Sequence, residues 1–92
     1  MKQRIFYVIK VMGDVTVGEE KMGELVQYFS PLPQSLVASP EEAINAYYTK
    51  EEAEELIAAE SQNWEEALGR AHPSFHIKQW GVVKVTILIE EV

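Results

Sequence analysis

The feature that most constrains the fold is an apolar run near the N-terminus, residues 5–11, with the sequence IFYVIKV. Its β-branched and aromatic residues favour a strand, and apolar side chains occupy both faces of that strand. A strand with two apolar faces has to be covered on both sides, so we expect it to be central in its sheet. A chain of 92 residues is large enough for one domain, residues 1–92, with a single core.

A second strand-forming segment lies at the other end of the sequence, in residues 75–92. Its last part, VVKVTILIEEV, alternates between apolar and polar residues, which is typical of a half-buried strand. Gly81 indicates a turn or a bulge in the middle of the segment. We expect both terminal segments to lie in the same sheet. The apolar face of the last strand consists of Val83, Val85, Ile87 and Ile89.

The region between the first strand and the helix carries weaker signals. Gly13-Asp14 and Gly18 predict that the chain turns after the first strand. Residues 24–29, ELVQYF, fit a helix by their spacing and a strand by their aromatic and β-branched content, and we favour a strand. Residues 30–39 contain two prolines, which a helix interior or a central strand does not tolerate, so we expect a loop or an irregular edge.

Two helix-start signals follow each other in the middle of the chain. Ser39 is followed by Pro40 and, three residues after the cap, by Glu42. Thr49 and Glu52 repeat this spacing in the form of a capping box, in which each side chain bonds the backbone of the other residue. The second signal is the stronger one, so we expect the main helix to begin there.

One amphipathic helix follows the second signal, with Gly69 and Pro73 as its stop signals. Glu60 interrupts the apolar stripe, so it either reaches solvent or pairs with a base such as Arg70 or Lys78. The sequence therefore predicts an α+β fold, in which a small antiparallel or mixed sheet of three to four strands carries one main amphipathic helix. The apolar stripe consists of Ala53, Leu56, Ile57, Trp64, Ala67 and Leu68.

Most of the net charge is stored in one stretch of the chain. Residues 41–66 contain nine glutamates and one cation, Lys50, so their net charge is −8, against −7 for the whole chain. The glutamates in the first turns of the helix lie mostly on its polar side, where they are solvated and complement the helix dipole. Acid–base catalysis needs one carboxyl group in an apolar pocket, which such a cluster does not offer. Scattered cations in a negative field also argue against direct binding of nucleic acid.

These features favour a small acidic, non-catalytic protein-binding module, with a homodimer formed through a sheet edge or exposed aromatics as one form of it. An alternative is an inhibitor of a basic DNA- or RNA-binding protein, in which the glutamates imitate phosphates. A third hypothesis is a small enzyme or ligand carrier. The candidate partner surface combines aromatic residues, which dominate interface hot spots, with helix glutamates. It consists of Tyr47, Tyr48, Trp80, Glu51, Glu52, Glu54 and Glu55.

The two tryptophans have different expected roles. Trp64 belongs to the apolar stripe of the helix, so we expect it in the core. Trp80 stands opposite the face of Phe75 and Ile77, just before Gly81, so it is the better candidate for exposure. Of the tyrosine pair before the helix cap, we expect one to pack as a hydrophobic staple and the other to face water.

We expect no metal, no cofactor and no catalytic residue. His72 and His76 are four residues apart, but Pro73 between them disfavours the helix that would bring both to one metal. The glycines lack the spacing of phosphate-binding loops. The chain has no cysteine, which rules out disulfides and suits the cytoplasm, and no segment approaches the roughly 18 apolar residues of a membrane span. We therefore expect a cytoplasmic protein that has no membrane partner.

Residues 43–58, AINAYYTKEEAEELIA, join an alanine and an aromatic pair to a capped acidic helix, and a β-rich segment follows later. This combination resembles the short accessory proteins encoded by phages and prophages of Gram-positive bacteria. The resemblance implies a small, non-catalytic protein that interacts with components of its host. It does not assign a role to any single residue.

Overall fold

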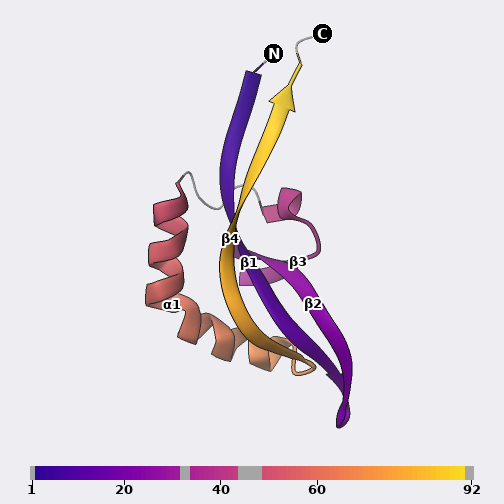
Figure 1. The fold of residues 1–92 in the computed structure, drawn as a ribbon. Helices are drawn as coiled ribbons and strands as arrows, with labels where there is room; N and C mark the ends of the chain where they lie inside the picture. Colours follow the sequence, from indigo (N-terminus) through magenta and orange to yellow (C-terminus); the bar gives the residue numbers. More distant parts are fainter. Residues whose placement is uncertain (1, 32–33, 44–48, 91–92) are drawn as a thin grey trace.

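The computed structural model describes residues 2–31, 34–43 and 49–90. Its strands form one antiparallel sheet in the order β3-β2-β1-β4. The helix α1 packs on one face of this sheet, and the short 3-10 helix η1 lies on the other face (Figure 1). The α+β fold expected from the sequence is thereby confirmed. The elements are β1 (Lys2–Val17), β2 (Glu20–Pro31), β3 (Gln34–Val37), η1 (Pro40–Ala43), α1 (Lys50–Ala71) and β4 (Phe75–Ile89).

The first strand is central, as its two apolar faces predict. β1 lies between β2 and β4 and pairs antiparallel with both. Ile9 and Val11 are fully buried beneath α1, whereas Val8 is fully buried on the opposite face, beside Ala43 of η1. Both faces of β1 therefore contribute to the core, and the pairing of β1 with β4 confirms that the two terminal segments share a sheet.

The first hairpin turns later than the sequence indicates. β1 continues through Gly13-Asp14, and the chain turns at Gly18, whose φ of 64° is a conformation that glycine adopts without strain. Residues 24–29 lie within β2, which confirms the strand interpretation. The expected loop of residues 30–39 contains the regular strand β3, so only the prediction of an edge position was correct there.

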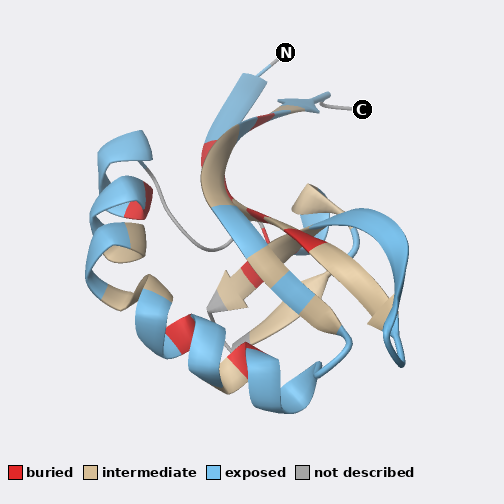
Figure 2. Ribbon diagram, turned by 60° about the horizontal axis from the view of Figure 1, so that its bottom comes forward, coloured by how far each residue is buried: buried red, intermediate tan, exposed pale blue. Residues whose placement is uncertain are grey.

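The start of α1 agrees with the sequence, and its end does not. Thr49 is the N-cap residue, and both hydrogen bonds of the capping box with Glu52 are present. The helix continues through Gly69 to Ala71, so the expected stop at Gly69 was two residues early. The buried positions of α1 face the sheet, while most of its remaining surface is exposed (Figure 2). They are Ala53, Trp64 and Leu68, three members of the predicted apolar stripe.

β4 contains a bulge close to its start. Met12 of β1 pairs with Gln79 and Gly13 pairs with Ile77, so Lys78 is an extra residue in β4. At this point the strands approach so closely that a Cβ on Gly13 would overlap the carbonyl oxygen of His76. Gly13 is therefore required by the close approach of two backbones rather than by a turn. Gly81, the residue expected to mark a turn or bulge, pairs regularly with Lys10.

The molecule is elongated, with extents of 52 × 28 × 19 Å. Its N- and C-terminal ends lie together, where β1 and β4 project beyond α1 (Figure 1). We call this projection, residues 2–7 of β1 and 84–89 of β4, the terminal ribbon. The pairing of β1 with β2 begins only at Ile9, so β4 is the one strand that pairs with the ribbon half of β1 among the described residues. The hairpin of β1 and β2 forms the opposite end.

Candidate functional site

The outer surface of α1 carries a large excess of negative charge. The helix contains seven glutamates and only two cations, Lys50 and Arg70, which lie near its two ends. Six of the seven glutamates are exposed, and five of these six fall within one broad sector of the helix, away from the positions of Ala53, Trp64 and Leu68. We call these five glutamates the acidic face: Glu51, Glu54, Glu55, Glu65 and Glu66.

The four glutamates predicted for a partner surface do not have equivalent surroundings. The Glu52 carboxylate accepts a hydrogen bond from the backbone N–H of Thr49 at 3.2 Å, so it belongs to the helix cap. The Glu54 carboxylate lies 3.5 Å from the ammonium group of Lys50, in an exposed pair one helical turn apart. Glu51 and Glu55 are exposed to solvent. These two residues are therefore the best placed of the four to meet a partner.

Trp80 lies in an aromatic cluster between α1 and the sheet. Its ring centroid is 5.6 Å from that of Trp64 and 5.9 Å from that of Phe29, and the rings of Phe29 and Trp64 are 4.5 Å apart. The indole N–H of Trp80 also donates a 2.7 Å hydrogen bond to the Glu65 carboxylate. Trp80 thus joins β4 to the helix and is half-buried, which makes it a structural residue first.

The expectation that Trp80 faces away from Phe75 and Ile77 is wrong. All three pack against the same buried cluster as Trp64. The bulge at Lys78 is the physical reason, because one extra residue reverses the alternation of every later side chain in the strand. Trp64 itself is only 6% exposed, as its place on the helix stripe predicts. Tyr47 and Tyr48, the other aromatic members of the predicted surface, lie outside the described residues.

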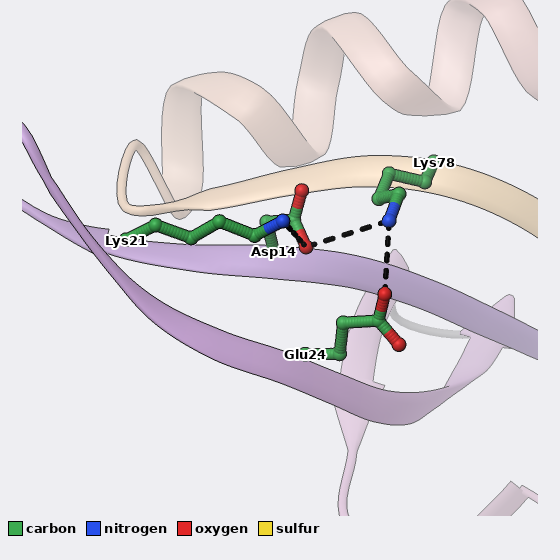
Figure 3. A network of polar contacts seen from close by, with 4 residues as sticks. All are labelled: Asp14, Lys21, Glu24 and Lys78. Carbon is green, nitrogen blue, oxygen red and sulfur yellow. Dashed lines mark hydrogen bonds and ion pairs between the residues drawn. The ribbon is translucent and has the colours of Figure 1, made fainter.

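A network of charges that the sequence did not reveal lies at the bulge (Figure 3). The ammonium group of Lys78 donates a 2.9 Å hydrogen bond to Glu24 and lies 3.6 Å from the carboxylate of Asp14. Lys21 approaches the same Asp14 oxygen to 3.4 Å. The hydrogen bond to Glu24 and the negative charges of Asp14 and Glu24 raise the pKa of Lys78 above its ordinary value. Three strands meet in this network, and no spacing within the sequence connects these residues.

The remaining candidate groups are not gathered into a cluster. Glu60 is half-buried and accepts a hydrogen bond from the side chain of Asn63, so neither Arg70 nor Lys78 fills the role of its expected partner. His72 and His76 are exposed, and the His76 ring lies 3.0 Å from the Thr16 hydroxyl in a hydrogen bond between β4 and β1. Across residues 2–31, 34–43 and 49–90, no group of three or more potential ligands could hold a metal ion.

A hollow of about 250 Å³ lies between the second half of α1 and the start of β4. It is lined in part by Phe75 and Ile77, and its two titratable residues, Glu65 and His76, are both exposed. Among the described residues, no polar or charged side chain is buried. The hollow thus combines a partly apolar wall with solvated polar groups.

The comparisons with known proteins add no relative. No protein-family model, no curated protein and no solved structure matches this chain. In the part of the chain that the structure describes, no helix has the length and apolar character needed to cross a membrane.

Proposed function

We propose that the protein is a small, non-catalytic protein-binding module whose acidic face on α1 contacts a basic surface of a partner protein. The observation that carries this proposal is the division of α1 into two sides. One side is occupied by the core through Ala53, Trp64 and Leu68, and the other presents a row of glutamates to solvent. We also propose that the protein is a prophage accessory protein, as the resemblance of residues 43–58 suggests. This role is compatible with the binding module.

The acidic face is suited to binding because the fold does not use most of its charge. Lys50 pairs with Glu54, and the indole of Trp80 donates a hydrogen bond to Glu65, whereas Glu51, Glu55 and Glu66 are solvated. Attraction between such a row and clustered cations accelerates encounter and favours basic partners over acidic ones. It is also screened by salt, which gives the proposal a measurable signature.

The test uses the whole protein, immobilised, to capture partners from an extract of its source cells at low and high salt. Charge reversal at two solvated positions, Glu51→Lys with Glu55→Lys, should abolish capture of the partner. The matched control is Glu19→Lys with Glu20→Lys, which changes the net charge equally at the exposed tip of the β1–β2 hairpin. The control should retain the partner, and thermal melting should show that both variants fold.

Two outcomes would contradict the proposal. The first is a partner that both charge-reversed variants retain, and the second is a partner held equally well at high salt. In the second case, the aromatic residues of the predicted surface are the better candidates for the contact, and Tyr48→Ala should weaken capture of the partner.

A second candidate function is imitation of a nucleic acid, because the acidic face extends over most of the helix, with three glutamates in its first two turns and two near its end. Glu51 and Glu66 are separated by about 22 Å along the helix axis, a length over which duplex DNA carries many phosphates. If this idea is right, the captured partner is a DNA- or RNA-binding protein, and added duplex DNA displaces the acidic protein from it. A partner that binds the protein and DNA at the same time would exclude imitation while leaving the broader proposal intact.

A further inference from the structure

The terminal ribbon lies beyond α1, so its helix-side face is largely exposed, whereas Phe6 and Val85 on the opposite face are buried and Val85 packs with Ala43 of η1. Its two strands pair with each other through residues 2–7 and 84–89, and α1 ends before reaching them (Figure 1). A two-stranded ribbon that is covered on one face only is less stable than a larger sheet. Among the described residues, no strand pairs with the outer edge of β4, so its outward backbone groups can pair with another strand.

The side chains of the ribbon do little to protect that edge. Ile5 is 42% exposed and Leu88 is 58% exposed, so apolar surface accompanies the free backbone groups. Residues 84–90 contain no proline and only two charges, Lys84 and Glu90. Neither of them forms a salt bridge with another described residue. Both charges are exposed and are therefore open to a partner.

The geometry of antiparallel pairing limits how β4 can pair with a second copy of itself. Along β4, the backbone N–H and C=O groups of every second residue point away from β1, toward the free edge. When the β4 strands of two copies pair, two directly opposed residues must both point these groups toward the other copy or both point them toward their own β1. A two-fold axis must therefore pass through a residue, not between two residues. This leaves a short series of registers, in which the axis passes through Lys84, Val85, Thr86, Ile87 or Leu88.

Charge complementarity selects one register from this series. With the axis at Ile87, Lys84 of each copy lies opposite Glu90 of the other. With the axis at Thr86, Lys84 faces Leu88 and the glutamate faces an apolar residue. With the axis at Lys84, two like charges oppose each other. The Ile87 register also aligns apolar residues, because Val85 then faces the isoleucine at position 89.

We propose that the terminal ribbon binds a second copy of this chain, with the outer edges of β4 paired antiparallel about Ile87. Each copy projects its ribbon in one direction, so antiparallel pairing over residues 84–90 sets the two helix-covered parts at opposite ends and keeps them apart. One face of the joined ribbons then carries an apolar row from both copies. The row consists of Val85, Ile87 and Ile89 of each copy, and the charge pairs lie on the other face.

Sedimentation equilibrium of the purified full chain tests the dimer and its charge pairs. Lys84→Glu and Glu90→Lys each turn two attractive cross-strand pairs into repulsive ones, so each should raise the dimer dissociation constant about tenfold. The double variant, Lys84→Glu with Glu90→Lys, restores opposite charges and should return the constant to within about threefold of the original value. Because neither residue has a salt bridge within the described chain, the variants should melt like the unaltered protein when each is monomeric.

Crosslinking tests the register directly, because the chain has no cysteine of its own. In the proposed register, Ile87→Cys places the thiol of one copy directly opposite the same thiol of the second copy, at a distance that a disulfide spans. Oxidation should therefore give a covalent dimer. Ile89→Cys is the matched control. In the proposed register its two thiols are offset by four residues, roughly 13 Å along the strands, and they should not join.

The outcomes separate cleanly. A tight dimer rescued by the charge swap and crosslinked only through position 87 supports the proposal. A protein that stays monomeric at every concentration overturns it, as does a dimer indifferent to the charge reversals or one that Ile89→Cys crosslinks equally well. None of these variants touches the acidic face of α1, so this proposal and the proposed function can fail independently.

Discussion

The same two strands, β1 and β4, have different surroundings in the two halves of the molecule. In the helix-covered half, Val11 and Trp80 are register partners, and the buried aromatic cluster and α1 lie over them. In the terminal ribbon, Ile5 and Thr86 are register partners, and both are exposed. The neighbouring ribbon pair, Phe6 and Val85, is buried on the opposite face, where Val85 packs with Ala43 of η1. Strand-forming residues are therefore sufficient to pair the two strands, but a face of the pair becomes core only where another element covers it.

Removing the Trp64 ring from α1 should remove most of the extra stability that the helix gives to the helix-covered half. Trp64→Ala deletes a ring that contacts both Phe29 and Trp80, and large aromatic truncations in cores cost about 3–5 kcal/mol. Because domains of this size have only about 5–15 kcal/mol of stability, the variant should lose a large part of its free energy of unfolding. Urea unfolding followed by circular dichroism measures the loss. A loss below about 1 kcal/mol would mean that the aromatic cluster does not hold the helix to the sheet.

A smaller loss is expected where the two strands approach most closely. Gly13→Ala introduces a methyl group that would meet the His76 backbone and the Phe75 ring, so β1 and β4 must separate at the bulge. Forcing an extra carbon into such a site typically costs about 1–3 kcal/mol. The same urea titration measures it, and Gly18→Ala is not an equivalent control because Gly18 has a positive φ. A neutral result would show that the bulge can relax without loss.

A gain in stability is expected from a glycine within α1. Gly69 is exposed, and a Cβ there meets nothing within 4 Å. Gly69→Ala should therefore stabilise the helix-covered half by roughly 0.5–1 kcal/mol, because alanine restricts the unfolded chain and glycine weakens helices. Thermal melting measures the shift. A lower melting temperature would indicate that the hollow beside Gly69 does not accept a methyl group.

The ribbon should tolerate a truncation that the helix-covered half would not. Leu88 is largely exposed, so Leu88→Ala should change the free energy of unfolding of the monomer by less than about 0.5 kcal/mol. Amide hydrogen exchange sharpens the comparison. At concentrations where the protein is monomeric, amides of residues 2–7 and 84–89 should exchange through local opening, faster than those of the buried part of β1. Equal protection along the whole of β1 would mean that the ribbon is not the weaker half.

The smallest effect concerns the charge network at the bulge, and its sign follows from the pKa of Lys78. Folding raises this pKa above 10.5, so the charged network stabilises the protein at neutral pH. That contribution is lost as the pH rises through the raised pKa. Lys78→Met should lower the urea midpoint slightly at pH 7, and the difference from the unaltered protein should vanish well above pH 10.5. A difference independent of pH would assign the effect to packing of the lysine stem.

Local signals were enough to predict most of the architecture. The two apolar faces of residues 5–11 placed β1 at the centre of the sheet, and Thr49 with Glu52 fixed the start of α1. These features depend on short-range patterns, which one sequence displays directly. Trp64 was assigned to the core for the same reason, because a helix brings its stripe together without reference to the rest of the chain.

The features that the sequence did not reveal depend on contacts between distant segments. Gly13 was assigned to a turn, although the reason for glycine at this position is the backbone of His76 in a strand far along the chain. The burial of Trp80 depends on the same pairing of β1 with β4, because the bulge at Lys78 places the Trp80 ring on the face that α1 covers. The network of Asp14, Glu24 and Lys78 likewise joins three strands, and only the register of the sheet brings these charges together.

The single extra residue in β4, Lys78, changes which residues of the strand face α1. Before Lys78, the odd-numbered residues of β4 face α1. After Lys78, the even-numbered residues face α1. Deletion of Lys78 would remove the bulge and give β4 one regular alternation, in which Ile77, Trp80 and Val82 still face α1. The extra residue therefore changes the sequence spacing of the helix-facing positions in β4, while the register with β1 decides which face they occupy.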